Sequence, residues 1–376
     1  MGPTPGLDLP RRDWIMNQLV ACCVVGVSAL LAPVASAQIA INPDFGGCYA
    51  LRELGQVPGV PFNYGGIAFK HDDPDVLLIG GNANGFNAAI YSIRVTRDGE
   101  GTINGFVGTA AFYANAPQID GGLAYGPGNV LFFSTFSNNT VGQIMSGSIN
   151  PDKVTGMNTV VQPSLGSLQF VPPGFPGAGR LKVASYSANQ WADVSFSPDG
   201  VGTFNLGATA NSLVSLVDGG GGIGPEGIVY VQPGNPGITQ HSVLISEYGR
   251  GAVSCYNLDA IGDPIMATRR VLVSNLSGAE GGTRDPRTGH FMFSTFGGGS
   301  NVVLVTGFNI NCRPNINGDC YTDDADFALF APMYNILDCA DPAMPLGCPG
   351  DFNDDGIVDD ADFVIFALAY DRLICQ

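Results

Sequence analysis

A glycine-rich opening followed by a short apolar segment recurs five times along the middle of the chain. A repeat of roughly 40–60 residues indicates that each copy is one supersecondary unit, and that neighbouring copies bury a shared core. This repeat constrains the fold more than any single motif does. The copies begin 56, 45, 60 and 54 residues apart, at GGIAF (65–69), GGLAY (121–125), GSLQF (166–170), EGIVY (226–230) and EGGTR (280–284).

Each opening is followed by further segments with the pattern of β-strands. Besides the second and third strands given below, a fourth strand can be recognised at 102–110, 202–208 and 269–275, and less clearly near 157–161. The second strands are VLLIGG (76–81), VLFFSTF (130–136), LKVASYS (181–187), VLISEYG (243–249) and FMFSTFG (291–297). The third strands are AIYSIRV (89–95), VGQIMSG (141–147), WADVSFS (191–197), AVSCYNL (252–258) and VVLVTGF (302–308).

Four short strands per unit are typical of a β-propeller. We therefore predict an all-β body over residues 45–310, with five blades, or six if one of the longer intervals holds an unrecognised blade. The last unit lacks a fourth strand, which the segment 49–55 (YALRELG) could supply, closing the ring. A β-sandwich is the alternative fold. The 53 Gly, 26 Pro and 45% hydrophobic residues fit an all-β protein with many tight turns.

The last 66 residues contain one short unit written twice with an offset of 36 residues. The pentapeptide DDADF stands at 323–327 and again at 359–363. In the second copy, a count from Asp351 puts oxygen donors at positions 1, 3, 5, 7, 9 and 12 and a glycine, Gly356, at position 6. A twelve-residue calcium loop requires that pattern. The predicted ligands are Asp351, Asn353, Asp355, the Ile357 carbonyl, Asp359 and Asp362.

The first copy fits calcium less well. Position 1 is uncharged, and position 6 is Cys320, which resists the positive φ that glycine tolerates. We expect weaker calcium binding or a structural role, with an ion-free loop as the alternative. For the second copy the alternative is an acidic turn that caps a helix through Asp359 or Asp360. The corresponding donors in the first copy are Asn315, Asn317, Asp319, the Tyr321 carbonyl, Asp323 and Asp326.

Each loop is followed by a segment with helical periodicity; in the second copy Phe363, Phe366, Ala367 and Tyr370 fall on one face. Two such loop–helix units resemble the dockerin domain, and in particular the dockerin-type tails of secreted planctomycete proteins. The resemblance covers 312–376. It implies Ca²⁺ as cofactor, attachment to a cohesin-like or cell-surface partner, and partner selection through 324–325 and 360–361.

The stretch LISEYGRGAVSCYNL (244–258) resembles a repeat of NHL or virginiamycin-lyase-like propellers. If the glycine openings are the innermost strands, Asn63, Asp120, Glu226 and Glu280 converge at one mouth of the channel. Such a ring could hold a second calcium ion, as in gluconolactonase-like propellers, or act as an acid–base pair. Alternatively, each carboxylate caps a turn amide. Tyr186, Trp191 and Tyr248 could stack on a carbohydrate, or pack within the fold.

The first 37 residues read as an export signal: Arg11 and Arg12, an apolar run from 19 to 31, and the small residues 35–37. We expect no membrane span after cleavage, and a secreted or cell-surface location.

In an oxidising compartment, equal spacing predicts the disulfides Cys312–Cys339 and Cys348–Cys375. Cys22 and Cys23 would leave with the export signal. Three of the nine cysteines then remain, so at least one is free or pairs outside the chain: Cys48, Cys255 and Cys320.

The formal net charge of −17 argues against a nucleic-acid partner, which needs a basic surface. The three histidines stand in turn-like segments and give little support to a Ser-His-Asp triad. We therefore expect a non-catalytic binding or display protein with a calcium-dependent attachment module. The alternative is a secreted carbohydrate-active hydrolase or lyase in polysaccharide catabolism, with Glu226, Glu280 and Asp120 as candidate catalytic residues.

Overall fold

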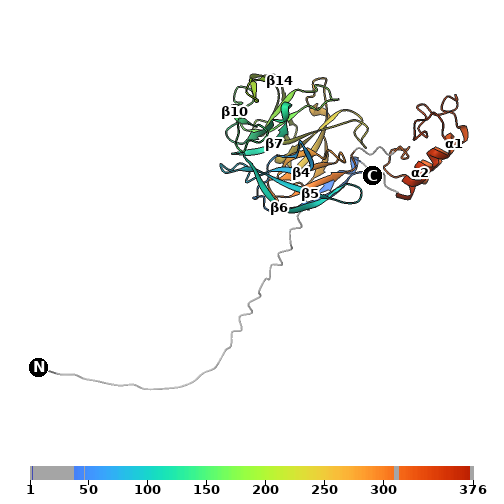
Figure 1. The fold of residues 1–376 in the computed structure, drawn as a ribbon, viewed down its shortest axis with the longest axis horizontal. Helices are drawn as coiled ribbons and strands as arrows, with labels where there is room; N and C mark the ends of the chain where they lie inside the picture. The colour runs from blue at the N-terminus through green and yellow to red at the C-terminus, as the bar shows by residue number, and fades with distance from the viewer. Residues whose placement is uncertain (1, 3–37, 46, 309–312, 373–376) are drawn as a thin grey trace. The chain divides into compact units, whose positions relative to one another are not determined.

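The computed structural model describes residues 2, 38–45, 47–308 and 313–372. The chain divides into two units, 1–37 and 38–376. The predicted export signal falls in the first unit and, apart from Gly2, lies outside the described residues. The second unit contains an all-β body followed by two helices (Figure 1). Neither helix in the described part of the chain is long and apolar enough to cross a membrane.

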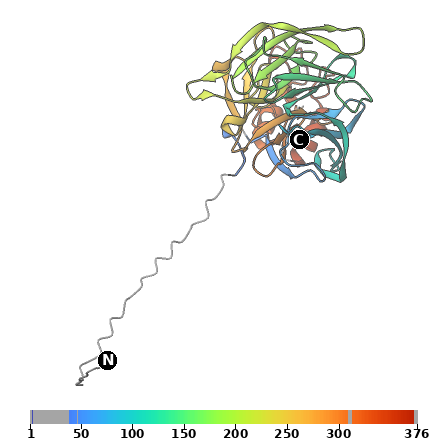
Figure 2. The ribbon, with the colours of Figure 1, turned by 90° about the vertical axis from the view of Figure 1, so that its left-hand side faces the viewer.

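The all-β body (Figures 1 and 2) is built from five antiparallel sheets, in each of which neighbouring strands follow one another along the chain, apart from one N-terminal strand added to each of the last two sheets. The prediction of a five-bladed propeller is confirmed. Blade 1 comprises β3 (Ile67–Lys70), β4 (Asp73–Gly81), β5 (Ala89–Arg97) and β6 (Ile103–Asn115). Blade 2 comprises β7 (Ile119–Tyr125), β8 (Leu131–Thr135), β9 (Thr140–Ile144) and β10 (Lys153–Gly156). Blade 3 comprises β11 (Leu165–Phe170), β12 (Leu181–Ser185), β13 (Gln190–Pro198) and β14 (Phe204–Ser215).

The last two blades each recruit a strand from the N-terminal end of the body. Blade 4 comprises β17 (Pro225–Val231), β18 (Ser242–Glu247), β19 (Ala252–Asn257) and β20 (Arg270–Ser274), with β1 (Ala40–Ile41) paired outside β20. Blade 5 comprises β21 (Ala279–Arg284), β22 (Phe291–Thr295), β23 (Val302–Thr306) and β2 (Ala50–Gly55). Because β2 pairs with β23, the segment predicted to close the ring does so.

The remaining elements are short. A hairpin joins β15 (Val217–Asp218) and β16 (Gly221–Gly222), and single 3₁₀ turns lie at η1 (Pro43–Phe45), η2 (Pro127–Asn129), η3 (Tyr248–Arg250) and η4 (Met266–Thr268). The predicted fourth strand of blade 2 was misplaced. It lies at β10, before the segment near 157–161, because β10 pairs with β9 through Lys153 and Gln143. In the helical region, α1 spans Asp324–Ile336 and α2 spans Asp360–Arg372.

The core of the described propeller consists of five clusters, each between two neighbouring blades. Adjacent residues of a second strand enter different clusters: Phe132 packs between blades 2 and 3, and Phe133 between blades 1 and 2. Successive side chains of a strand point to opposite faces. A strand buried on both faces therefore needs a continuous apolar run, which explains the sequences of the second strands.

The recurring glycines belong to the five innermost strands. In each blade, a Cβ added at one of these glycines would come closer than 3 Å to an atom of the next blade, so the inner strands pack at a distance that only glycine permits. These close approaches run once around the ring. Gly66 faces Leu123, Gly122 faces Leu168, Gly166 faces Pro225, Gly227 faces Gly282, and Gly281 faces Gly66.

Candidate functional site

Three acidic side chains from three different blades meet at the centre of the propeller. Asp120 comes from β7, Glu226 from β17 and Glu280 from β21, each near the start of an innermost strand. One carboxylate oxygen of each lies within 4.8 Å of the others. Their residues are only 2%, 2% and 1% exposed, respectively. The predicted convergence is therefore confirmed for these three residues.

The fourth predicted member, Asn63, is not part of this group. Its backbone N–H donates to Ser300 Oγ at 2.8 Å, and it does not line the cavity beside the carboxylates. Asn84, which follows β4, lines that cavity instead. Sequence reasoning missed Asn84 because blade 1 has no acidic residue in its opening and contributes its polar side chain from a loop.

The cavity above the carboxylates has a volume of about 100 Å³ and an aromatic wall made by Phe136, Tyr186 and Tyr248. These rings contact one another edge to face, with centroids 6.2 Å apart for Phe136–Tyr186 and 5.5 Å for Tyr186–Tyr248. Each follows the second strand of its blade. Phe296 occupies the same place in blade 5 and continues the series, with its ring centroid 6.2 Å from that of Tyr248.

Trp191 does not join this wall. It is fully buried, and its indole N–H donates to Asp263 at 2.8 Å, so it is a packing residue. The suggested stacking platform of three aromatic residues is thus reduced to Tyr186 and Tyr248. An aromatic residue directly after the second strand in four of the five blades is the signal that would have identified Phe136.

Burial shifts the pKa values of all three carboxyl groups upward, and charge repulsion adds to the shift for Glu226 and Glu280. Burial raises the pKa of Asp120 to about 7, opposed by hydrogen bonds from Glu280 and Asn84. Burial and then the charge of Asp120 hold the pKa of Glu226 well above its usual value. The pKa of Glu280 is raised by burial and then by the charges of Glu226 and Asp120. Such a group binds either protons or a cation.

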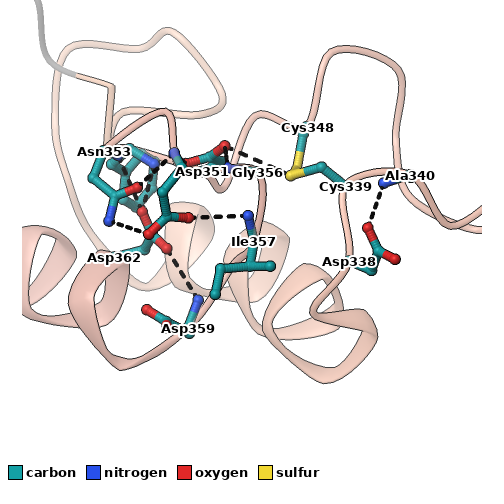
Figure 3. Close-up of a disulfide and its surroundings, with 12 residues drawn as sticks. Asp338, Cys339, Ala340, Cys348, Asp351, Asn353, Gly356, Ile357, Asp359 and Asp362 are labelled. Carbon is teal, nitrogen blue, oxygen red and sulfur yellow. Dashed lines mark hydrogen bonds between the residues drawn. A yellow bond between two sulfur atoms is a disulfide. The ribbon is translucent and has the colours of Figure 1, made fainter.

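A second acidic site lies in the loop before α2 (Figure 3). Oxygens of Asp351, Asp355 and Asp362 lie within 4.8 Å of one another, and Gly356 has φ 91°. Asp362 is fully buried and accepts hydrogen bonds from the backbone N–H groups of Phe352 at 2.7 Å and Asp359 at 3.0 Å. The loop thus gathers predicted ligands around one point, as a calcium loop requires.

The first loop repeats most of the hydrogen bonds of the second loop. The N–H of Asn317 donates to Asp326 at 2.9 Å, and the N–H of Asn353 donates to Asp362 at 3.2 Å. Position 6 also has positive φ in both copies, although it is Cys320 in the first, at φ 82°. The first loop therefore takes the calcium-loop conformation with a residue that is strained in it.

The predicted helix-capping role is present in the same residues. The Asp323 side chain accepts from Ala325 N–H at 2.8 Å, and Asp326 closes a capping box with it. Asp359 accepts in the same way from Ala361 N–H at 2.8 Å. Of the predicted ligands, Asp359 and Asp323 thus already have a function in starting their helices.

The two copies pack around a pseudo-twofold relation. Tyr334 of α1 donates to Asp360 at the start of α2, and Tyr370 of α2 donates to Asp324 at the start of α1 at 2.6 Å. These four residues are related by the 36-residue offset. The small core between the copies contains Phe330, Met333, Met344, Phe352, Val358 and Phe366.

The predicted disulfides of this region are wrong. Cys339 bonds to Cys348, with Cα atoms 5.4 Å apart, so neither can pair as predicted with Cys312 or Cys375 (Figure 3). The segment that links the two copies reverses direction between Cys339 and Cys348, which brings these two cysteines together. The equal spacing in the sequence had instead suggested one disulfide within each copy. Cys48 bonds to Cys320, and Cys255 is free and buried.

Five antiparallel blades closed by an N-terminal strand, with an acidic cluster on the axis, define a β-propeller protein. No family model and no curated protein matches the chain. Among solved structures, it is similar to a streptogramin B lyase, at 12% identity and a TM-score of 0.35 over 69% of this chain and 97% of that one. It is also similar to an auxiliary nutrient binding protein from Bacteroides ovatus, at 10% identity and a TM-score of 0.39 over 69% and 76% of the two chains.

A third similar structure is the PQQ-bound aldose sugar dehydrogenase of Streptomyces coelicolor, at 14% identity and a TM-score of 0.35 over 67% of this chain and 83% of that one. These likenesses are too low to carry any argument about activity. The fold assignment rests on the strand pairing of this chain itself.

Proposed function

We propose that this protein is an exported propeller that displays a binding surface, attached through a calcium-dependent, dockerin-like C-terminal module. The partner of the module would be a cohesin-like or cell-surface protein. The main support for this proposal is the conformation of the loop 351–362. Oxygens of Asp351, Asp355 and Asp362 lie within 4.8 Å of one another there, and Gly356 has a positive φ. Disulfide bonds agree with export, because they persist in oxidising compartments.

The surface of the C-terminal helices supports an attachment role. Apolar side chains are exposed to water on both helices of this small acidic unit. An exposed apolar surface of this kind marks a site of contact with another molecule. Phe327 and Phe363, equivalent in the two copies, are 44% and 43% exposed. Leu329, Val364 and Leu368 extend the apolar surface. Asp324–Ala325 and Asp360–Ala361, where dockerins select their partners, are also exposed.

Calcium titration of the full chain tests the proposal. Asp351→Ala removes a ligand at position 1 of the second loop, so we expect the heat of calcium binding at that loop to disappear in isothermal titration calorimetry. Asp354→Ala is the matched control. It removes the same charge from the same loop, but at position 4, where the side chain is 73% exposed and pairs with Arg313. Equal calcium heat in both variants would contradict the assigned ligands.

The same two variants test attachment. In the producing cells, the wild-type chain and Asp354→Ala should stay with the envelope fraction and leave it on washing with a calcium chelator. Asp351→Ala should appear in the medium, because a loop that does not bind calcium does not order the helices that contact the partner. Retention of all three chains in the presence of chelator would contradict calcium-dependent attachment.

The alternative, a carbohydrate-active hydrolase or lyase, has weaker support. Glycosidases separate their two carboxyl groups by about 5 Å or more so that a sugar and water fit between them. Here the carboxylate oxygens crowd within 4.8 Å beside a cavity of about 100 Å³. Pockets that enclose a small-molecule ligand have volumes of roughly 300–1,000 Å³. A carbohydrate ligand therefore fits better against the outer faces of Tyr186 and Tyr248 than beside the carboxylates.

A further inference from the structure

Each of the three axial carboxylates has a buried oxygen atom without a hydrogen-bond partner. Glu226 Oε2, Glu280 Oε1 and Asp120 Oδ2 are buried and accept no hydrogen bond, and Asn84 Oδ1 beside them is also unpartnered. Buried polar atoms are otherwise satisfied almost everywhere in native proteins. Four oxygen atoms without hydrogen-bond partners at one cavity therefore indicate that this cavity binds a positively charged ligand.

Among the described residues that line the cavity, no side chain supplies that charge. The cavity is lined by four polar residues, all oxygen donors to a cation, and three aromatic residues, with no lysine, arginine or histidine among them. Elsewhere in the described propeller, buried acids have such partners: Asp193 and Asp263 contact Lys182 at 2.7 and 2.5 Å. A buried carboxylate without a counter-charge costs several kcal/mol. Three of them together would be unfavourable unless a cation or protons neutralised them.

We propose that Asp120, Glu226 and Glu280 bind one divalent cation on the axis of the propeller, with Asn84 as a further oxygen ligand. The ligand set consists of hard oxygen atoms, which favours calcium over zinc. Oxygens on opposite sides of a calcium ion are about 4.6–5.2 Å apart, twice the usual bond length. The oxygens of the three carboxylates lie within 4.8 Å of one another, so their separations are small enough for one ion to contact all three. The cavity leaves room for water or a ligand oxygen to complete the coordination.

This ion would act where the ring is held together. Its three carboxylate ligands come from blades 2, 4 and 5, and Asn84 follows the second strand of blade 1. One ion at this position would therefore link four of the five blades. The aromatic residues Phe136, Tyr186 and Tyr248 line the same cavity as these ligands.

Calcium binding by a full-length chain with both C-terminal loops disabled tests this proposal separately from the proposed function. Asp319→Ala together with Asp355→Ala removes a position-5 ligand from each loop and leaves the propeller unchanged. We expect calorimetry with Ca²⁺ alone to show one bound ion per chain. Absence of any binding to this parent would overturn the proposal and leave the carboxylates neutralised by protons. That result would not affect the calcium heat assigned to the C-terminal loops.

Substitutions in the axial site then locate the ion. Adding Glu226→Gln and Glu280→Gln to the parent should abolish its binding, whereas Glu53→Gln and Glu100→Gln remove the same charge from the propeller surface and should leave binding unchanged. An ion that stays bound to the axial variant would overturn the assignment. Because neutral glutamines remove buried repulsion, the calcium-free axial variant should melt no lower than its parent, which shows that it folds.

Terbium gives an independent measurement that does not depend on the ligand variants. Tb³⁺ in a calcium site emits when a nearby tyrosine is excited, and Tyr186 and Tyr248 line this cavity. In the parent with disabled C-terminal loops, Tyr248→Phe should lower the sensitised emission without weakening terbium binding. Emission unaffected by this change, and by Tyr186→Phe, would place the ion elsewhere and overturn the proposal.

Discussion

Two serines fasten neighbouring blades to each other through backbone groups of the innermost strands. Ser134 of β8 accepts from Gly122 N–H at 2.9 Å and donates to Gly166 O of blade 3 at 2.7 Å. Ser294 of β22 accepts from Gly281 N–H at 2.9 Å and donates to Gly65 O of blade 1 at 2.6 Å. Both serines are fully buried. Each hydroxyl thus satisfies a donor and an acceptor that no strand pairing reaches.

Replacing either serine should destabilise the propeller. Ser134→Ala leaves a buried N–H and a buried carbonyl unpaired, which costs about 1–3 kcal/mol in the free energy of unfolding measured with denaturant. Ser246 occupies the same position in blade 4, but its hydroxyl is buried without a hydrogen-bond partner. Ser246→Ala should therefore cost nothing or stabilise the chain slightly. Equal losses in the two variants would show that the inter-blade hydrogen bonds contribute nothing.

The innermost strands are the elements that decide the radius of the ring. Their glycines bring the backbone of one blade against that of the next, and their acidic residues stand directly before those glycines: Asp120 before Gly121, Glu226 before Gly227 and Glu280 before Gly281. The same local sequence therefore sets the packing distance and places the carboxylates on the axis. A wider ring would separate the acids and lose the axial cavity.

A single methyl group on an inner strand tests this arrangement. The Cβ in Gly227→Ala would overlap backbone atoms of Gly282 and Glu280 in blade 5. Because backbone cannot move aside as a flexible side chain does, we expect a loss of about 3 kcal/mol or more in unfolding free energy. Gly156, in the outer strand β10, has no atom within 4 Å of an added Cβ. Gly156→Ala should be neutral or stabilise by up to about 1 kcal/mol.

At the scale of the whole molecule, the ring is closed by residues far apart in the sequence. Strand β2 pairs with β23, with Leu51 opposite Val305. Arg97 of blade 1 forms a bidentate ion pair with Asp285 of blade 5, at 2.7 and 2.9 Å. The five inter-blade clusters then bury both faces of every sheet. Closure leaves no inner sheet edge open to association with another chain.

The axial acids make the stability of the closed ring depend on pH. Burial raises the pKa of Asp120 to about 7 in the folded chain, above its usual value of 3.8. The folded state therefore binds this proton more tightly than the unfolded state. The resulting stability is fully present below about pH 4 and is lost as the pH rises through about 7.

Denaturant unfolding in chelator, from pH 4 to pH 8, measures this effect against Asp120→Asn, which keeps the side-chain shape and cannot ionise. We expect the stability of the wild-type chain relative to the variant to fall as the pH rises. The comparison removes the contribution of other acids that titrate in both chains. A difference between the two chains that stays constant with pH would contradict the raised pKa of Asp120.

Sequence periodicity determined the blade count, the order of strands and the closing role of β2, because each of these follows from a local pattern repeated along the chain. The offset of the two acidic loops likewise predicted matched helices and the positive φ of Gly356. These features depend on strand alternation, helix periodicity and turn chemistry, which act over a few residues. Local physics was sufficient for them.

Only the tertiary structure decided which residues meet. Asn84 replaced Asn63 beside the carboxylates, Trp191 turned inward to Asp263, and Cys339 bonded to Cys348 instead of Cys312. Each outcome depends on the direction of a side chain or the path of a loop in three dimensions, and one sequence carries no signal for either. The convergence of Asp120, Glu226 and Glu280 needed both: repeated spacing put them on equivalent strands, and the close packing of glycine backbones brought them within reach of one another.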